Sequence, residues 1–401
     1  MQCRTIELTA LNRTMLLDII TEYAAIIALS IGFAHATVSD IPAIFPAIPA
    51  VASFEAVDTT QYFKRSPDDF IHPGIWHTHE DLERIRENVL NNTEPWASTY
   101  QLFRADQYSL VNYTMEGPFA VISRGQTSNY SSFAHDARAA WQNALMWYIT
   151  KDQSHWDRST SILDAWGSNL TDIIGIDRSL LIGVDGDLFV NAAEIMRWEG
   201  NWTETGADGR GEVGLAISCT GSSHGSRRCT ITRFTRTFRT ATLGYSPMYH
   251  PETGQSVEAG RDQDKFLCHT MSGIGWSAYG ARVGQSQGSD LYSLGRALLL
   301  QAAEYAANYN LNHTVVYNPQ WYRCEAVPVK GSWQAISEAN RGVTKHNPIW
   351  DVLYYEYVVR RGNQGPWTAA AKEAQGLAGG VTSNDHPSWG DLIWARHVNV
   401  H

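Results

Sequence analysis

Hydrophobic side chains recur at helical spacing in one long stretch of the chain, 131–150. Phe133, Ala137, Ala140, Trp141, Met146 and Trp147 follow a period near 3.6 residues, with no glycine or proline in the stretch. Such a period predicts an amphipathic helix. Similar stretches predict helices at 157–170, 187–198, 290–309, 348–360 and 366–374, several of them opened by Asp or Pro, which favour helix starts.

Alternating patterns typical of strands are few, and the predicted helices are separated by long loops that contain Gly, Asn and Pro. This combination predicts an all-α chain in which stacked helical hairpins close into an (α/α)n toroid or incomplete barrel. With 401 residues, two or three domains or one large α/α barrel would fit the length. We expect one domain, spanning 61–401.

The charge and the aromatic content narrow the range of ligands. Lys plus Arg of 31 against Asp plus Glu of 41 gives a net charge of −10, so the chain offers no general attraction to nucleic acid or to an anionic membrane. An anionic ligand therefore needs a local Arg or His site. Fifteen Trp and eighteen Tyr are many for a core alone and suit stacking on sugar rings.

The N-terminal sequence predicts export. Arg4 and Arg13 precede an apolar run at 23–33, and the small-x-small pattern at 34–36 predicts a signal peptide of residues 1–36. Residues 37–60, rich in Ala, Pro and Ile, are expected to form an extended arm, and no later apolar run reaches the length of a membrane span. Six glycosylation sequons agree with a secreted, extracellular glycoprotein: Asn91, Asn112, Asn129, Asn169, Asn201 and Asn312.

Four cysteines follow the predicted signal peptide: Cys219, Cys229, Cys268 and Cys324. They form no Cys-x-x-Cys pair, so one or two disulfides are expected rather than a metal site. We predict that Cys219 is bonded to Cys229, because closing nine intervening residues of one loop is geometrically easy. Peptide mapping checks this pairing, and a bond from Cys229 to Cys268 or Cys324 would contradict it.

The segment 201–242 differs from the rest, with nine Thr, six Arg and no Lys. Three interpretations remain open. It is a basic loop closed by a disulfide, a contact for a polyanion, or the product of an altered exon boundary that replaced helical sequence.

Several stretches resemble secreted alginate-lyase-like polysaccharide lyases. The run 72–78 leading into 81–85 resembles their first helix, and further similar stretches lie at 136–150, 191–197, 254–263, 285–291, 337–342 and 382–394. The most specific is Glu258-Ala-Gly-Arg-Asp-Gln263, followed by a His and by Gly273-Ile-Gly275. The resemblance implies a toroid with a long groove and cofactor-free, metal-free β-elimination on a uronic-acid polymer such as alginate or glucuronan. It has two departures, the segment 201–242 and an insertion at 265–268.

Elimination on a uronate needs a group that neutralises the carboxylate, a base for the C5 proton and an acid for the leaving oxygen. Arg261 is the candidate neutraliser, since guanidinium binds carboxylate through two parallel hydrogen bonds, although a surface ion pair is its alternative role. His269 is the candidate base, because its ordinary pKa lies near the working pH; a structural histidine is the alternative. Tyr249 is a second acid or base candidate, or part of a turn before Pro251.

Substrate-binding candidates lie in four places. Asn191 and Glu194 share one face of a predicted helix and either present an amide to the substrate or form a buried hydrogen-bonded pair. The other candidates are Asn129 with His135 at the groove, Glu258 in the specific block, and His386 with Trp389 at the groove rim, where Asp385 alternatively caps a helix. Three nearby histidines, His72, His77 and His79, lack regular ligand spacing, so no metal site is expected.

The sequence contains no Gly-x-Ser-x-Gly elbow, Walker loop or dinucleotide fingerprint. This argues against a serine hydrolase and against a nucleotide-dependent enzyme. We therefore expect a secreted, monomeric polysaccharide lyase whose partner is an anionic polysaccharide. One alternative is an inverting α/α-barrel glycoside hydrolase, which needs two carboxyl groups about 6.5–9.5 Å apart. The other is a catalytically inactive carbohydrate-binding protein.

Overall fold

The computed structural model describes residues 70–124, 129–175, 178–202, 249–256, 258–260, 269–319, 334–338, 341, 348–377 and 386–397. Within these residues the chain is rich in helix, and the strands are two three-residue segments, β1 (Val121–Ser123) and β2 (Asp172–Ile174), which pair in parallel. The predicted signal peptide, the N-terminal arm, 203–248 and all the cysteines lie outside the described residues. None of the described helices is long and apolar enough to cross a membrane.

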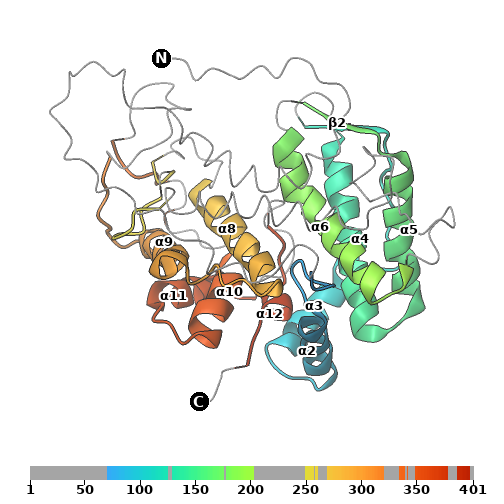
Figure 1. The fold of residues 1–401 in the computed structure, drawn as a ribbon, viewed down its shortest axis with the longest axis horizontal. Coiled ribbons are helices and arrows are strands. Elements are labelled where there is room, and N and C mark those ends of the chain that lie inside the picture. The colour runs from blue at the N-terminus through green and yellow to red at the C-terminus, as the bar shows by residue number, and fades with distance from the viewer. Residues whose placement is uncertain are drawn as a thin grey trace.

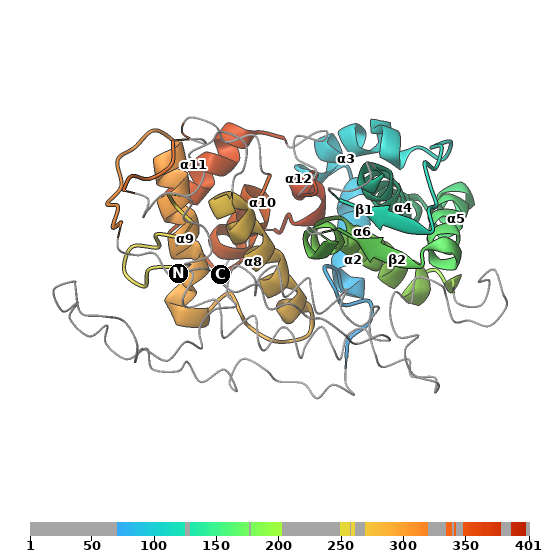
Figure 2. The same cartoon turned by 90° about the horizontal axis from the view of Figure 1, so that it is seen from above.

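Two groups of helices lie side by side (Figures 1 and 2). The first group consists of α2 (His79–Leu90), α3 (Trp96–Ala105), α4 (Tyr130–Thr150), α5 (Gln153–Asn169) and α6 (Arg178–Trp198). The second consists of α8 (His269–Ser286), α9 (Leu294–Asn310), α10 (Trp350–Leu353) with its π-helical continuation (Tyr354–Arg360), α11 (Pro366–Gln375) and α12 (Gly390–Ile393). The prediction of a helix-rich chain with few strands is confirmed.

Helix α4 is the centre of the first group, because α5 and α6 pack against it. Phe133, Trp141 and Trp147 of its predicted apolar face are buried, and so are polar residues such as Asp136. Asp136 accepts hydrogen bonds from Tyr113 Oη (2.7 Å), Trp166 Nε1 (2.8 Å) and two backbone amides. A buried carboxylate is tolerated here because its oxygens are satisfied by donors.

The six helices predicted from periodicity correspond to α4, α5, α6, α9, α10 with its continuation, and α11. Asp187 does not start a helix, because α6 begins nine residues earlier, at Arg178. Among the α-helices in the described part of the chain, α3 and α8 were not predicted. In α8, glycine and serine occupy many buried positions, so the apolar period that would mark the helix is missing.

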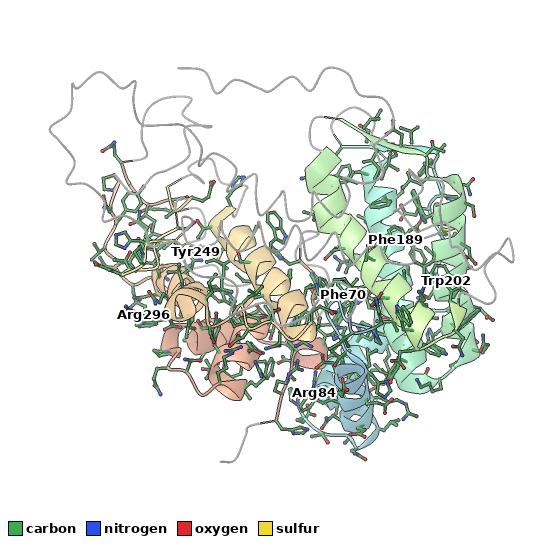
Figure 3. The ribbon with its side chains drawn as sticks, viewed as in Figure 1. Phe70, Arg84, Phe189, Trp202, Tyr249 and Arg296 are labelled. Atoms are coloured by element: carbon green, nitrogen blue, oxygen red, sulfur yellow. The ribbon has the colours of Figure 1, made fainter. Side chains whose placement is uncertain are left out.

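Residues 70–78, named here the opening segment, join the two groups. The backbone N–H of Trp76 donates to Asn191 Oδ1 of α6 (3.2 Å), and its carbonyl accepts from Arg282 Nε of α8 (2.7 Å). Gln287, just after α8, donates from Nε2 to the carbonyls of Ile71 (3.0 Å) and Gly74 (2.6 Å). Phe70, at the start of this segment, lies between α8 and α6 in Figure 3. The opening segment is therefore held from both sides by side chains.

Candidate functional site

Helix α8 separates His269 from the opening segment, which Asn191 and Glu194 contact. His269 is its first residue, and the opening segment is bound beside its last turn through Gln287. A helix of 18 residues is about 27 Å long at 1.5 Å per residue. Candidates at its two ends are therefore too far apart to act on the same atom of a substrate.

The specific block 258–263 is described only up to Gly260, and this part forms a buried turn. Ala259 N donates to Ser256 O (3.1 Å), and Ser337 N donates to Ala259 O (2.8 Å). Glu258 is buried, with its backbone N–H on Ser256 Oγ (3.1 Å). The turn thus fixes the start of the segment that leads to Arg261, which itself lies outside the described residues. Glu258 is held in this turn, and its predicted contact with substrate stays a prediction.

Gly254 begins the same stretch and requires glycine. Its φ is +75°, in the left-handed region, and an added Cβ would lie 2.2 Å from the backbone oxygen of Gln301 in α9. The neighbouring Gln255 donates from Nε2 to Asn318 O (2.9 Å) and accepts from Asn318 N (2.7 Å). The stretch is therefore pinned to α9 and to the loop that follows it.

Tyr249 is fully buried and lies with the second helix group (Figure 3). Its hydroxyl is 3.4 Å from Ser277 Oγ of α8, and burial raises the pKa of Tyr249 to about 12. A fully buried hydroxyl does not reach a polymer in solvent. In this structure the Tyr249 hydroxyl therefore lies in the core, and its role as a second acid or base stays a prediction.

His386 and Trp389 are buried at 0% and 2% exposure, so their predicted place at a groove rim is wrong. The His386 ring lies 5.8 Å from Trp276 and 5.7 Å from Tyr279, and its Nε2 is 3.4 Å from Ser272 Oγ. Burial lowers the pKa of His386 to about 3. Trp389 packs edge-on against Phe103 of α3. Both side chains belong to the core where α12 begins.

Asn191 is buried, and both ends of its amide are used: Oδ1 accepts from Trp76 N (3.2 Å) and Nδ2 donates to Asp187 O (2.9 Å). Asn191 is thus buried and bonded to the opening segment and to its own helix, while its predicted contact with substrate stays a prediction. Glu194, one turn later, instead binds His72 of the opening segment, with Oε1 2.6 Å from His72 Nδ1. The helix face thus anchors the opening segment.

Asn129 and His135 lie at the beginning of α4. The Asn129 amide accepts from Ser123 N (3.0 Å) and donates to Val121 O (2.9 Å), which fixes β1. His135 Nδ1 is 2.8 Å from Glu116 Oε1. Because the Asn129 amide is occupied by β1, a substrate contact through it would have to release this strand; a contact through His135 stays a prediction.

The three neighbouring histidines have three different surroundings. His72 pairs with Glu194, His79 pairs with Glu199 (3.0 Å), and His77 is buried with its ring stacked on Trp394 at 5.5 Å. Burial, assisted by Arg282 and Arg84, holds the pKa of His77 well below its usual value. Within the part of the chain that the structure describes, no three His, Cys, Asp or Glu side chains are grouped so that they could hold a metal ion.

Among the described residues, Asp351 and Asp391 form a pair of carboxylates that can be compared with those of a glycoside hydrolase. Burial raises the pKa of Asp351 to about 6, a shift typical of a general acid. However, Asp351 is fully buried, and Lys372 Nζ lies between it (3.0 Å) and Asp391 (2.9 Å). Tyr355 Oη also donates to Asp391 (2.5 Å). This pair of carboxylates connects α10, α11 and α12 inside the protein and does not face a substrate.

Trp198, the last residue of α6, was not among the predicted site residues. Its side chain is 45% exposed, and the His72 ring stacks on it at 4.3 Å with an interplanar angle of 19°. The guanidinium of Arg197 lies 5.3 Å from the centre of the indole ring. Trp198 directly follows the stretch 191–197. It is one of fifteen tryptophans, and the sequence does not indicate which of them are exposed. Only the structure reveals it.

Comparisons with known proteins assign no family to this sequence. No protein-family model matches the sequence, and no curated protein matches it. Among solved structures, an alginate lyase from Bacteroides ovatus is similar with a TM-score of 0.48 and 10% sequence identity, over 81% of this chain and 100% of that chain.

Proposed function

We propose that this chain is a polysaccharide lyase that cleaves a uronic-acid polymer, such as alginate or glucuronan, by β-elimination. The observation that supports the proposal is that the stretches resembling alginate-lyase-like enzymes contact one another, in two sets. Asn191 binds the backbone of Trp76, Gln287 binds Gly74, and Ser337 binds Ala259. The toroid with its groove, and export as a glycoprotein, are parts of the same proposal.

In this proposal, Arg261 and His269 carry the chemistry. Arg261 binds the uronate carboxylate, which makes the C5 proton more acidic. His269 takes that proton, the C5–H electron pair forms the C4=C5 double bond, and the C4–O bond breaks with its electrons on the leaving oxygen, which an acid protonates. His269 is the first residue of α8. The buried turn at 258–260 directly precedes Arg261 in the sequence and is held by hydrogen bonds.

The test is a screen of purified polyuronates with the secreted chain. β-Elimination leaves an unsaturated product that absorbs ultraviolet light, so a rise in absorbance with one polymer identifies both reaction and substrate. New reducing ends without absorbance would instead mean hydrolysis. Binding of a polyuronate without any product would mean an inactive carbohydrate-binding protein. Either of these outcomes overturns the proposal.

We expect the activity to survive a chelator. The proposed steps use Arg261 and His269, and the sequence contains no ligand set with regular metal spacing. The measurement is the initial rate after dialysis against EDTA, compared with a mock-dialysed sample. A loss of activity that one added divalent metal restores would contradict the expectation.

A further inference from the structure

The end of α6 forms a small surface, named here the α6-end surface, that consists of His72, His79, Arg197 and Trp198. Glu194 and Glu199 lie behind the two histidines. The His72 side chain is 24% exposed against 12% for its partner Glu194, and His79 is 58% exposed against 14% for Glu199. The side chains that reach solvent are therefore nitrogen donors and an indole ring, while the carboxylates face inwards.

The indole of Trp198 is large, exposed and held in place. Among the described residues, it is the tryptophan that appears with the exposed large apolar side chains. Stacking on His72, which Glu194 holds at 2.6 Å, fixes the ring orientation. A rigid exposed indole loses little conformational entropy on binding and offers an apolar face to the C–H groups of a sugar ring.

One cationic side chain lies beside the indole, and the neighbouring carboxylates are paired. Arg197 lies 5.3 Å from the ring centre, and Lys151 Nζ lies 3.5 Å from the ring centre of Tyr148, whose hydroxyl is 3.5 Å from His79 Nδ1. Of the neighbouring carboxylates, Glu194 and Glu199 are paired with histidines, and Glu83 accepts from Tyr148 Oη (2.5 Å). In a chain of net charge −10, Arg197 is the cation that the structure places beside the indole, and its guanidinium is the group that would bind a carboxylate there.

We propose that the α6-end surface is a binding subsite for a uronate unit of the polysaccharide, with the sugar ring against Trp198 and its carboxylate on Arg197. The inference rests on the proposed function for the identity of the polymer. It adds a binding site that is separate from the site of the reaction. His72 is next to Ile71, and Gln287, just after the last turn of α8, binds Ile71. His269 is at the first turn of the same helix. The subsite holds the chain of the polymer and takes no part in proton transfer.

The test measures binding directly, without requiring turnover. Isothermal titration calorimetry measures the affinity for polyuronate oligosaccharides and, separately, for an uncharged oligosaccharide of equal length. Wild-type protein should bind the uronate. Trp198→Ala should weaken binding about tenfold, of the order measured for one aromatic contact, and Trp198→Phe should keep most of the affinity. Arg197→Gln should weaken uronate binding while leaving any binding of the uncharged sugar unchanged.

The matched control is Phe119→Ala, which removes another partly exposed aromatic ring, 36% exposed and in contact with Trp166. It should bind like wild type, and circular dichroism should show all variants folded. Trp198→Ala with wild-type affinity overturns the subsite, even if elimination is observed. Conversely, Trp198-dependent binding of uronate without any elimination product rejects the lyase and keeps the subsite. Equal, Trp198-dependent binding of charged and uncharged sugars rejects the assignment to uronate.

Discussion

Replacing His269 by alanine is expected to lower the rate of β-elimination by about 10²-fold or more, the loss typical of removing a positioned acid or base. Replacing Arg261 by alanine should cost about 2–4 kcal/mol of transition-state stabilisation, as removal of one preorganised donor to a developing anion does. Both effects should appear in kcat/KM on the polyuronate that the screen identifies. Thermal unfolding should show that both variants remain folded.

Two matched variants make this result specific. His313→Ala removes an exposed histidine whose ring packs on Trp367 at 4.4 Å, and it should leave the elimination rate unchanged. Tyr249→Phe removes a buried hydroxyl and should have little effect on the rate. If His269→Ala kept near-full activity while Tyr249→Phe lost it, the base would have been assigned to the wrong residue. Rates of Arg261→Ala equal to wild type would likewise reject the neutraliser.

Periodicity predicted α4 well because this helix is buried against other helices over most of its length. It is packed between α5 and α6, so apolar residues recur on its faces and no glycine interrupts them. Helix α8 is equally buried but was not predicted. At Gly275 an added Cβ would lie 2.5 Å from Ile349 and 2.8 Å from His386. Close packing by small residues depends on what lies opposite, and those partners come from other parts of the chain.

The candidate site shows the same limit for polar residues. Asn191 and His386 have side chains that suit a sugar-binding groove, yet the structure buries both. Asn191 is used by the backbone of Trp76, which lies 115 positions away in the sequence. His72 and Glu194, separated by 122 positions, form the pair that holds Trp198 in place. A single sequence specifies the chemistry of such residues but gives no pairing between distant ones.

The buried His386 should make the protein sensitive to acid. Because burial lowers its pKa to about 3 in the folded state, the unfolded chain, with an ordinary histidine pKa near 6.5, binds the proton first as the pH falls. The stability from neutral His386 is therefore fully present above about pH 6.5 and is lost progressively towards pH 3. Each pH unit in this window costs at most about 1.4 kcal/mol, so the free energy of unfolding should fall by about 3 kcal/mol between pH 7 and pH 4 from this group alone.

Comparison with His386→Asn isolates this effect from other titrating groups. Asp351 acts in the opposite direction, because burial raises its pKa to about 6; the stability from its protonated form is present in acid and is lost as the pH rises through 6. This contribution is common to wild type and variant and cancels in their difference.

The variant should be less stable at pH 7, because it lacks the ring packed on Trp276 and Tyr279, but its unfolding free energy should change much less between pH 7 and pH 4. The same substitution at exposed His313 should leave the wild-type pH dependence intact. Urea unfolding at each pH provides the measurement, and an acid loss in His386→Asn as large as in wild type would show that His386 is not the titrating group.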